Sequence, residues 1–397
     1  MLKKLLLASL IVLAMLFCFV ACDDNSSSKK PSFDAKSTPL TLENIGKDSL
    51  IVTITISGFG PDEANMKYSI DGGNMQEIPS TGMPYIEVEA GKTISFYGDR
   101  AENASSQAKT ISIACSSACY VYGNVMSLIT STDFEANTSL EKYAYAFKGL
   151  FKNNTKIKLH ESKELVLPAQ TLAPHCYAEM FYGCVGLTKA PELPATTLAE
   201  ACYSFMFYGC KKLIKAPKLP AMNLAEQCYS AMFSVCEALV SAPELPATTL
   251  APLCYQVMFS NCSNLTKAPE LPATTLAERC YEGIFSNCAG LTSTPSLPAN
   301  TLARLCYSYM FFGCTSLTKA PELPATTLVE RCYEGMFAGC TNLASVTCLA
   351  KTTAQDATKT WLSTVAPTGS FTRPADADFW TTDANGIPSG WTTIDAE

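Results

Sequence analysis

The sequence predicts an α+β fold: a solenoid of 26-residue repeats, each a helix followed by a short extended segment, preceded by a small all-β domain. One phrase recurs seven times between Pro168 and Leu343 without insertion, and a fixed period of this length is typical of solenoids. Most copies carry apolar residues at helical spacing and then two prolines. Upstream, residues 39–124 contain short, alternating, β-branched segments that indicate strands.

The N-terminus has the pattern of an export signal. Lys3 and Lys4 precede an apolar run, so residues 1–21 are expected to be a cleaved signal peptide. The run ends at Cys22 and resembles the lipobox of bacterial lipoproteins; the resemblance implies a diacylglyceryl group on the Cys22 sulfur. An ordinary signal or an uncleaved anchor is the alternative, although the run is short for a membrane span. The polar residues 22–38 predict a disordered tether.

Residues 39–124 are expected to form a small β-sandwich-like domain. The predicted strands are residues 50–56, 67–70, 85–88, 93–97 and 110–113. Such a domain is expected to act as a spacer, with a second binding site as the alternative. Cys115 and Cys119 could form a local disulfide or remain thiols.

Both ends of the array are expected to carry caps. In the N-terminal cap, residues 125–167, the segment 146–157 aligns with the repeat but lacks both of its cysteines, as a terminal repeat often does. A Thr138/Glu141 capping box is expected to start its helix. The C-terminal cap, residues 344–397, has a helical pattern over 349–365 and holds all three tryptophans of the chain. Large apolar residues there would cover the open end of the solenoid, or form a terminal recognition domain.

Within one of the seven repeats of residues 168–343, local signals predict a helix of about ten residues. Thr197 and Glu200 match a capping box, and Gly209 occupies a helix-stop position that Gly or Asn fills in every copy except Val235. Cysteines and aromatic residues four apart form one apolar face. The prolines that follow lack backbone donors, so any parallel ladder between repeats must be short or broken.

The cysteines allow more than one interpretation. Each repeat has a Cys-x7-Cys pair that could form a disulfide if the helix ends between them, since export permits disulfides. The thiols could instead be small buried side chains stacked in two ladders. A metal site is not expected, because no further thiol or imidazole lies at zinc-binding spacing. Without Cys18 and Cys22 the count is odd, which leaves at least one thiol without an intramolecular partner.

The repeated phrase G-C-x-x-L-T-x-x-x-x-L-P resembles the BspA-type leucine-rich repeats of bacterial surface proteins. The resemblance covers about half of the chain, and it implies surface display and binding of protein or host matrix, with no catalytic residues to transfer. The longer repeat, its Cys-Tyr turn and its prolines depart from the family pattern.

Candidate contact residues are those that break the repeat. The Tyr ladder that begins at Tyr177 has helical spacing to a Phe four residues on and is interpreted as core. Aromatic residues that replace small or polar ones at other positions are better candidates for ligand contact. These candidates are Tyr182, Phe205, Tyr208, Tyr309 and Phe312.

Composition narrows the classes of function. The formal charge of −7 and the lack of a basic patch argue against nucleic acid. Two histidines, no nucleophile–base pair and no phosphate loop argue against an enzyme, and no cofactor or metal is predicted. We expect a lipid-anchored bacterial cell-envelope protein, at the outer membrane with surface exposure left open, whose solenoid binds an unknown protein or glycan. The alternative is a structural or antigenic display protein without a dedicated ligand.

Overall fold

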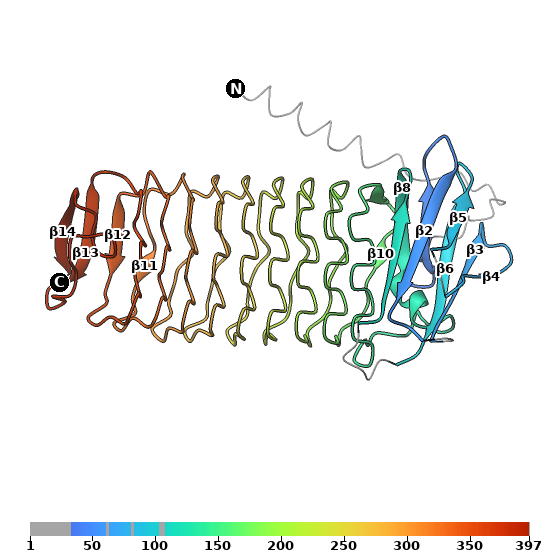
Figure 1. Ribbon diagram of the computed structural model, residues 1–397, viewed down its shortest axis with the longest axis horizontal. Helices are drawn as coiled ribbons and strands as arrows, with labels where there is room; N and C mark the ends of the chain where they lie inside the picture. Colours follow the sequence, from blue (N-terminus) through green and yellow to red (C-terminus); the bar gives the residue numbers. More distant parts are fainter. Residues whose placement is uncertain (1–32, 61–62, 81–82, 103–107, 397) are drawn as a thin grey trace, which may run out of the picture. The chain divides into compact units, whose positions relative to one another are not determined.

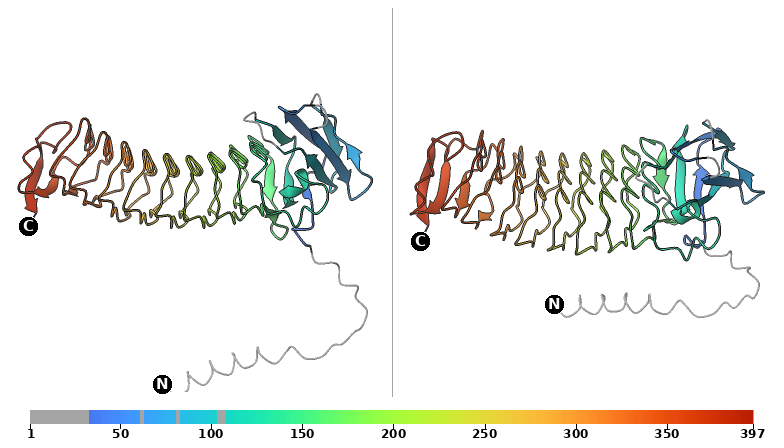
Figure 2. Two further views of the ribbon diagram at one scale, coloured as in Figure 1. Left: turned by 90° about the horizontal axis from the view of Figure 1, so that it is seen from below. Right: turned by 60° about the horizontal axis from the view of Figure 1, so that its bottom comes forward.

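The computed structural model describes residues 33–60, 63–80, 83–102 and 108–396. A β domain is followed by coils of chain that lie side by side along the array (Figures 1 and 2). The expected signal peptide, Cys22 and residues 22–32 of the expected tether lie outside the described residues. In the described part of the chain, no helix is long and apolar enough to cross a membrane.

The β domain consists of two sheets. One has the strand order β10-β8-β1-β6-β3-β4, with β9 also paired to β8, and the other has the order β5-β2-β7. The bounds are β1 Leu40–Asn44, β2 Leu50–Ser57, β3 Ala64–Ile70, β4 Gln76–Glu77, β5 Tyr85–Val88, β6 Thr93–Arg100, β7 Thr110–Cys115, β8 Cys119–Asn124, β9 Ile157–Leu159 and β10 Leu165–Val166. Each of the five predicted strands is present, but the sequence reasoning missed β1, β4 and β8, as well as β9 and β10 in the region predicted as the N-terminal cap. Alternation explains the fold: Leu50, Val52 and Ile54 of β2 are buried, and the residues between them are less so.

The predicted helices of the repeats are wrong. The only helix among the described residues is the short 3₁₀ segment η1, Val125–Leu128, and the α+β assignment of the solenoid therefore fails. In the segment that was expected to be helical, Ala201, Phe205 and Gly209 all have positive φ, at 48°, 56° and 70°. A left-handed residue at every fourth position interrupts an α-helix, and the segment is instead a series of tight turns.

Backbone hydrogen bonds show why the turns replace a helix. The Met206 N–H donates to the Tyr203 carbonyl within its own coil at 3.1 Å, whereas the Tyr203 N–H donates to the Cys228 carbonyl of the next coil at 3.0 Å. An α-helix would direct both donors to its own chain. Here alternate donors tie each coil to its neighbour, which a helix cannot do.

The residues predicted as helix capping boxes do not start helices, and Thr197 instead links two neighbouring coils. The Thr197 carbonyl accepts the Leu172 N–H of the preceding coil at 3.1 Å, and Thr197 forms an isolated parallel bridge with Thr171. The Thr138/Glu141 box also starts no helix, because the segment that follows consists of turns. Val235 shares the left-handed conformation of Gly209, with a φ of 61°, which is a strained value for a β-branched residue.

Stacked side chains fill the interior of the array. The Tyr and Phe rings of consecutive coils lie nearly parallel, as at Tyr203–Tyr229, 5.8 Å apart, and Phe207–Phe233, 5.5 Å apart. All 17 cysteines of the described residues are free thiols. The second cysteine of each repeat donates to the carbonyl of a Phe in the preceding coil, as Cys236 does to Phe207 at 3.2 Å. The structure therefore has two buried thiol ladders and no disulfide among these residues.

The prolines interrupt the sheet on the opposite side of each coil, as predicted. Neighbouring coils meet there in isolated bridges such as Lys189–Lys215. At the C-terminal end, Val346 and Leu349 replace the two prolines, and a continuous parallel sheet appears. Its strands are β11 Glu322–Leu323, β12 Ser345–Cys348, β13 Gly369–Pro374 and β14 Trp391–Ala396.

The helix predicted over 349–365 is also wrong, because this segment is one more coil of turns. Its left-handed residues are Asp356, Thr360 and Thr364. Trp361 is fully buried and takes the place of the Met in earlier coils, where it contacts the last rings of both aromatic ladders, Tyr333 at 6.2 Å and Phe337 at 6.4 Å. The tryptophan thus ends the core of the array.

Candidate ligand-binding surface

The turn segment of each coil presents two outward positions. In the coil of residues 200–209, Phe205 is exposed and Tyr208 is half-buried, while Met206 and Phe207 between them are buried. Three of the other six repeats carry small residues at both positions, namely Ala231 with Ser234, Gly283 with Ser286 and Gly335 with Ala338. A large side chain here adds nothing to the core and projects from the turn surface.

Three of the predicted contact residues form one group, which we call the Tyr182 cluster: Tyr182, Phe205 and Tyr208. Tyr182 and Tyr208 stack with ring centroids 4.7 Å apart, and Phe205 lies 5.8 Å from Tyr208 at a tilted angle. The Lys152 ammonium lies 5.0 Å from the Tyr182 ring centroid and also pairs with Glu179. The cluster combines rigid aromatic area with a cation, a combination that is frequent at protein interfaces.

The other two predicted residues form a separate pair. Tyr309 and Phe312 meet edge to face at 6.0 Å, and the Tyr309 hydroxyl donates to the Glu334 carboxylate at 3.3 Å. Partial burial, followed by the Glu334 charge, raises the pKa of Tyr309. Gly335 makes room for this ring, since a Cβ there would lie 2.4 Å from Cε1 of Tyr309. Because Phe205 and Tyr309 are four repeats apart, the five residues do not form one site.

Both leading aromatics have strained backbones. Phe205 and Tyr309 have φ values of 56° and 55°, at a position that Gly283 and Gly335 occupy in other coils. For a residue with a Cβ, this conformation costs roughly 1–2 kcal/mol. The equivalent residues Glu179, Ala231 and Val257 have φ values of 58°, 53° and 46°, so the left-handed conformation belongs to the repeat. What distinguishes Phe205 and Tyr309 is the size of their exposed aromatic side chains.

The comparisons with known proteins bear on the array. A family model described as a BspA type leucine rich repeat region matches in six copies, over residues 161–288 and 254–358, about half of the chain. The repeat array belongs to the BspA-type leucine-rich repeats. The family supports a protein-interaction or surface repeat protein. Neither the curated proteins nor the solved structures that were compared gave a match.

The leucine-rich repeat array also exposes aliphatic side chains that the sequence reasoning missed. Ile214, Met222 and Val240 are 52%, 51% and 50% exposed. Ile214 and Val240 replace a threonine that occupies the same position in most other repeats, as at Thr266 and Thr292. Comparing repeats position by position for all apolar residues, and not only for aromatics, would have found them.

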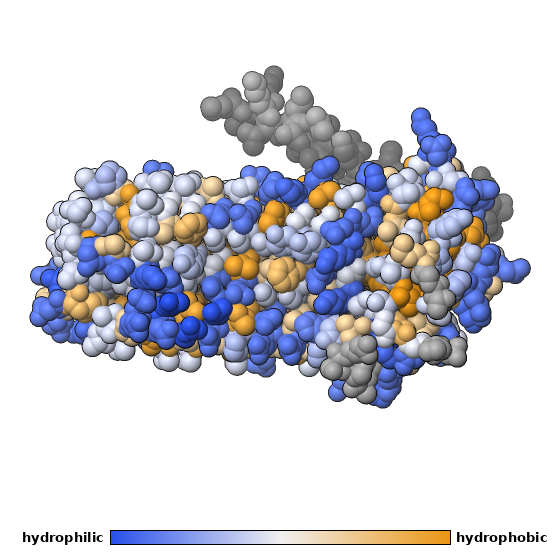
Figure 3. Space-filling model, in the orientation of Figure 1, coloured by the Kyte–Doolittle hydropathy of each residue, from blue (hydrophilic) through white to orange (hydrophobic). Residues whose placement is uncertain are grey.

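Charged residues cover another part of the turn surface. Arg304 bridges Glu278 of the preceding coil at 2.9 Å and Glu330 of the following coil at 3.2 Å; the two glutamates are exposed and Arg304 is half-buried. Figure 3 shows strongly hydrophilic residues gathered over the C-terminal half of the array on the face in view, with hydrophobic residues scattered among the others. The charges here are paired, so this surface does not form a patch of one sign.

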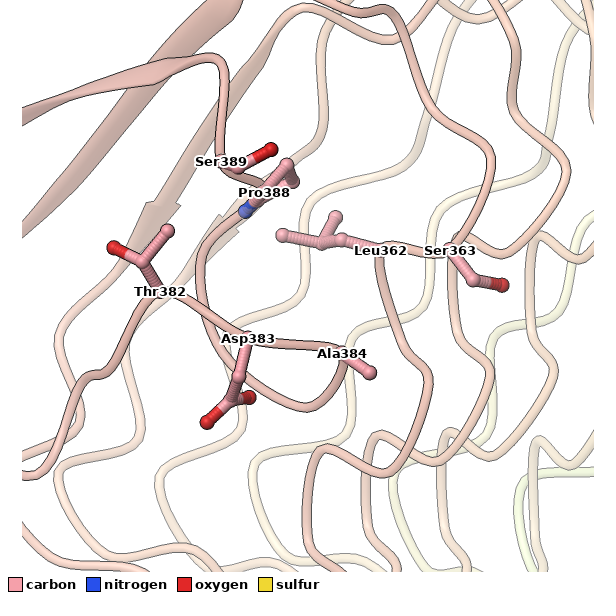
Figure 4. Close-up of a pocket in the computed structure, with 7 residues that line it drawn as sticks. All are labelled: Leu362, Ser363, Thr382, Asp383, Ala384, Pro388 and Ser389. Atoms are coloured by element: carbon pink, nitrogen blue, oxygen red, sulfur yellow. The ribbon is translucent and has the colours of Figure 1, made fainter.

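Two small pockets lie at the C-terminal end of the leucine-rich repeat array. One, of about 320 Å³, is lined by Leu362, Ser363 and the loop 382–389 (Figure 4). The other, of about 190 Å³, has Phe379 and Trp380 in its lining together with polar residues that include Asp356 and Asn385. Among the described residues, no three His, Cys, Asp or Glu side chains gather closely enough to hold a metal ion.

Proposed function

We propose that this chain is a lipid-anchored protein of the bacterial cell envelope that binds another macromolecule through the turn surface of its repeat array. The observation that carries the proposal is the Tyr182 cluster. Its aromatic side chains project where the next coil has Ala231 and Ser234, and Phe205 is 38% exposed. Binding energy at interfaces is concentrated in a few aromatic and cationic side chains of this kind.

Adhesion of coated beads can test the binding proposal. Beads carrying the chain without residues 1–22 would be applied to immobilised extracellular-matrix extract and to a blocked surface. The test variant is Tyr182→Ser with Phe205→Ala and Tyr208→Ser, which places at each position a residue that the array itself uses one or two coils later. The matched control is Tyr85→Ser, which removes an exposed aromatic side chain of the β domain, outside the turn surface.

The proposal expects the test variant to lose at least about tenfold in half-saturating bead density, as removal of a hot spot would cause. The control should adhere like the original chain. If the beads adhere to matrix no better than to the blocked surface, the competing function, structural or antigenic display without a dedicated ligand, is preferred.

The anchor is proposed from sequence alone, because Cys22 lies outside the described residues. Supporting it are the apolar run that ends at this cysteine and the polar residues that follow. We place the protein at the outer membrane. Proteolysis of intact cells, with release of the array as the readout, distinguishes display at the cell surface from a position facing the periplasm.

A further inference from the structure

Backbone donors without a partner mark the C-terminal end of the array. In the seven coils that begin with the one around Tyr177, the N–H of the ladder Tyr donates to the next coil, ending with Tyr333 to the Ala357 carbonyl at 2.8 Å. The N–H of the ladder Phe does the same, ending with Phe337 to the Trp361 carbonyl at 2.9 Å. The equivalent donors of the last coil belong to Thr358 and Leu362, and within the described part of the chain they have no hydrogen-bond acceptor.

The other end of the array is closed. Arg100 of the β domain is buried, and its guanidinium donates to the Ala146 carbonyl at 2.8 Å and to the Ala144 carbonyl at 3.2 Å. The Ile113 N–H donates to the Leu150 carbonyl at 2.7 Å. These are carbonyls of the first coil, which has no coil before it to supply donors. Because they are occupied, a second copy of the chain cannot stack its first coil onto the donors of the last one.

The two residues that carry these donors line the two pockets. Thr358 lines the smaller pocket and Leu362 the larger one. Between them, the Thr360 N–H donates to the side-chain oxygen of Asn385 at 3.0 Å, and the Trp361 indole N–H donates to the Gly386 carbonyl at 2.9 Å. The Asn385 side chain therefore shows which acceptor fits this row of N–H donors, namely the carbonyl oxygen of an amide. Asn385 also prevents an extended peptide from binding along the whole row of donors, because it occupies the central donor, the Thr360 N–H.

The rest of the smaller pocket suits a ligand that donates as well as accepts hydrogen bonds. Asp356 and Asp383 supply carboxylate oxygens, although Asp383 also accepts from the Thr381 hydroxyl at 2.6 Å and from the Asn385 N–H at 2.7 Å. Phe379 and Trp380 form a half-buried apolar wall. Lys359 also lines this pocket and Arg331 pairs with Asp356 at 3.9 Å, so the charges around it are mixed and favour a neutral ligand over a strongly charged one. A compact ring with hydroxyl groups, an apolar face and one amide satisfies all of these groups at once.

We propose that the C-terminal end of the array binds an N-acetylated aminosugar, with its acetamido carbonyl on the Thr358 N–H, its hydroxyl groups on the two aspartates and its apolar ring face against Phe379 and Trp380. The site is separate from the turn surface on which the proposed macromolecular binding rests. Failure of one proposal therefore leaves the other standing.

Tryptophan fluorescence reports on this end alone, because all three tryptophans, Trp361, Trp380 and Trp391, belong to it. The chain without residues 1–22 would be titrated with N,N′-diacetylchitobiose, with cellobiose, which lacks the acetamido groups, and with N-acetylglycine methylamide, which lacks the sugar. We expect a saturable change with diacetylchitobiose and at least about tenfold weaker binding of the other two, as the loss of one or two hydrogen bonds would give.

The test variant is Asp356→Asn, since Asn keeps the shape of the side chain and tolerates the φ of 55° at this position. It should weaken diacetylchitobiose binding about tenfold through loss of a charged acceptor. Asp376→Asn is the matched control, because Asp376 is exposed, pairs with Lys351 at 2.9 Å and lines neither pocket. The absence of any fluorescence change, or equal binding by Asp356→Asn, overturns the proposal, as does equal binding of the sugar-free amide, which would indicate a peptide ligand.

Two solid supports distinguish the sources of such a sugar. Retention of the chain on purified bacterial cell-wall sacculi places the ligand in the cell wall, and retention on an immobilised glycoprotein with chitobiose-cored glycans places it on glycoproteins. Retention on neither support overturns the proposal.

Discussion

Raising the pH above 9 should unfold the array, because its buried thiols cannot ionise in place. Burial raises the pKa of Cys202 and Cys210 from 9.0 to about 12, and the other repeat cysteines are shifted in the same direction. Since the folded pKa lies above the unfolded one, this contribution to stability is complete below pH 9 and is lost as the pH rises through 9 towards 12. From pH 8 to pH 10, each thiol lowers the free energy of unfolding by about 1.4 kcal/mol, or by roughly 2.7 kcal/mol for the two thiols of one coil.

The array holds seven such pairs, so the summed effect at pH 10 is roughly 19 kcal/mol, more than the 5–15 kcal/mol by which most domains are stable. The assay is urea unfolding followed by far-ultraviolet circular dichroism at pH 8 and pH 10, with a reducing agent present throughout. We expect a large fall in the urea midpoint at pH 10. A variant with Cys228→Ala and Cys236→Ala should be less stable at pH 8 but lose less between the two pH values. Equal midpoints at pH 8 and pH 10 in the original chain would refute the reasoning, and would be expected if the cysteines formed disulfides.

Three further predictions concern single positions. Arg100→Met should lower the local stability of the first coil by about 3 kcal/mol or more, because its carbonyls lose charged hydrogen-bond donors. Hydrogen exchange of the amides in residues 143–154 should then accelerate, whereas Arg304→Met should leave their exchange unchanged. Gly335→Ala should lower the free energy of unfolding by about 2 kcal/mol, measured by thermal unfolding, because the Tyr309 ring crowds the new Cβ. In a Tyr309→Gly background, which lacks this ring, the loss should be about half as large. Equal losses in both backgrounds would contradict the crowding. Cys22→Ala should abolish palmitate labelling in growing cells, and labelling that persists would rule out the anchor at this residue.

The strands of the β domain could be predicted because the pattern and the structure have the same cause. Alternating burial in β2 and β6 leaves a period of two in the sequence, as in residues 50–56. β1 and β8 were harder to find. Thr41 and Asn44 are buried polar residues within β1, where they hydrogen-bond to Ser95 and to backbone carbonyls, so the strand does not show clean alternation.

The turns of the array could not be told from helices by periodicity. A left-handed residue at every fourth position places Cys202 and Met206 on one buried side, and a helix would also place residues four apart on one side. The Gly or Asn at the third left-handed position was recognised as a helix stop. The first two positions hold Ala201 and Phe205, residues that give no sign of a positive φ. Contacts between coils hold them in this conformation, and single-repeat reasoning cannot see such contacts.

For the candidate sites, the sequence could identify residues that depart from the repeat but could not show which of them meet. The grouping of Tyr182 with Phe205 and Tyr208 follows from the offset between adjacent coils, which the exact repeat length determines. At the C-terminal end, the three tryptophans indicated a cap or a recognition domain, but nothing in the sequence indicated the pockets. They arise where the ladder of donors ends at Thr358 and Leu362, and backbone groups leave no mark in a pattern of side chains.

The same hydrogen-bond scheme explains why the two ends of the array differ in chemistry. In every turn segment, the N–H groups that bond to another coil donate to the next coil towards the C-terminus, as Tyr203 does to Cys228. The carbonyls of the segment accept hydrogen bonds from the preceding coil. The first coil therefore presents carbonyls and needs a donor cap, which the guanidinium of Arg100 supplies. The last coil presents donors and needs acceptors, of which Asn385 supplies only one. A stack with this polarity has a donor-rich end wherever it stops, and a terminal segment that covers such an end incompletely creates a binding site from the backbone itself.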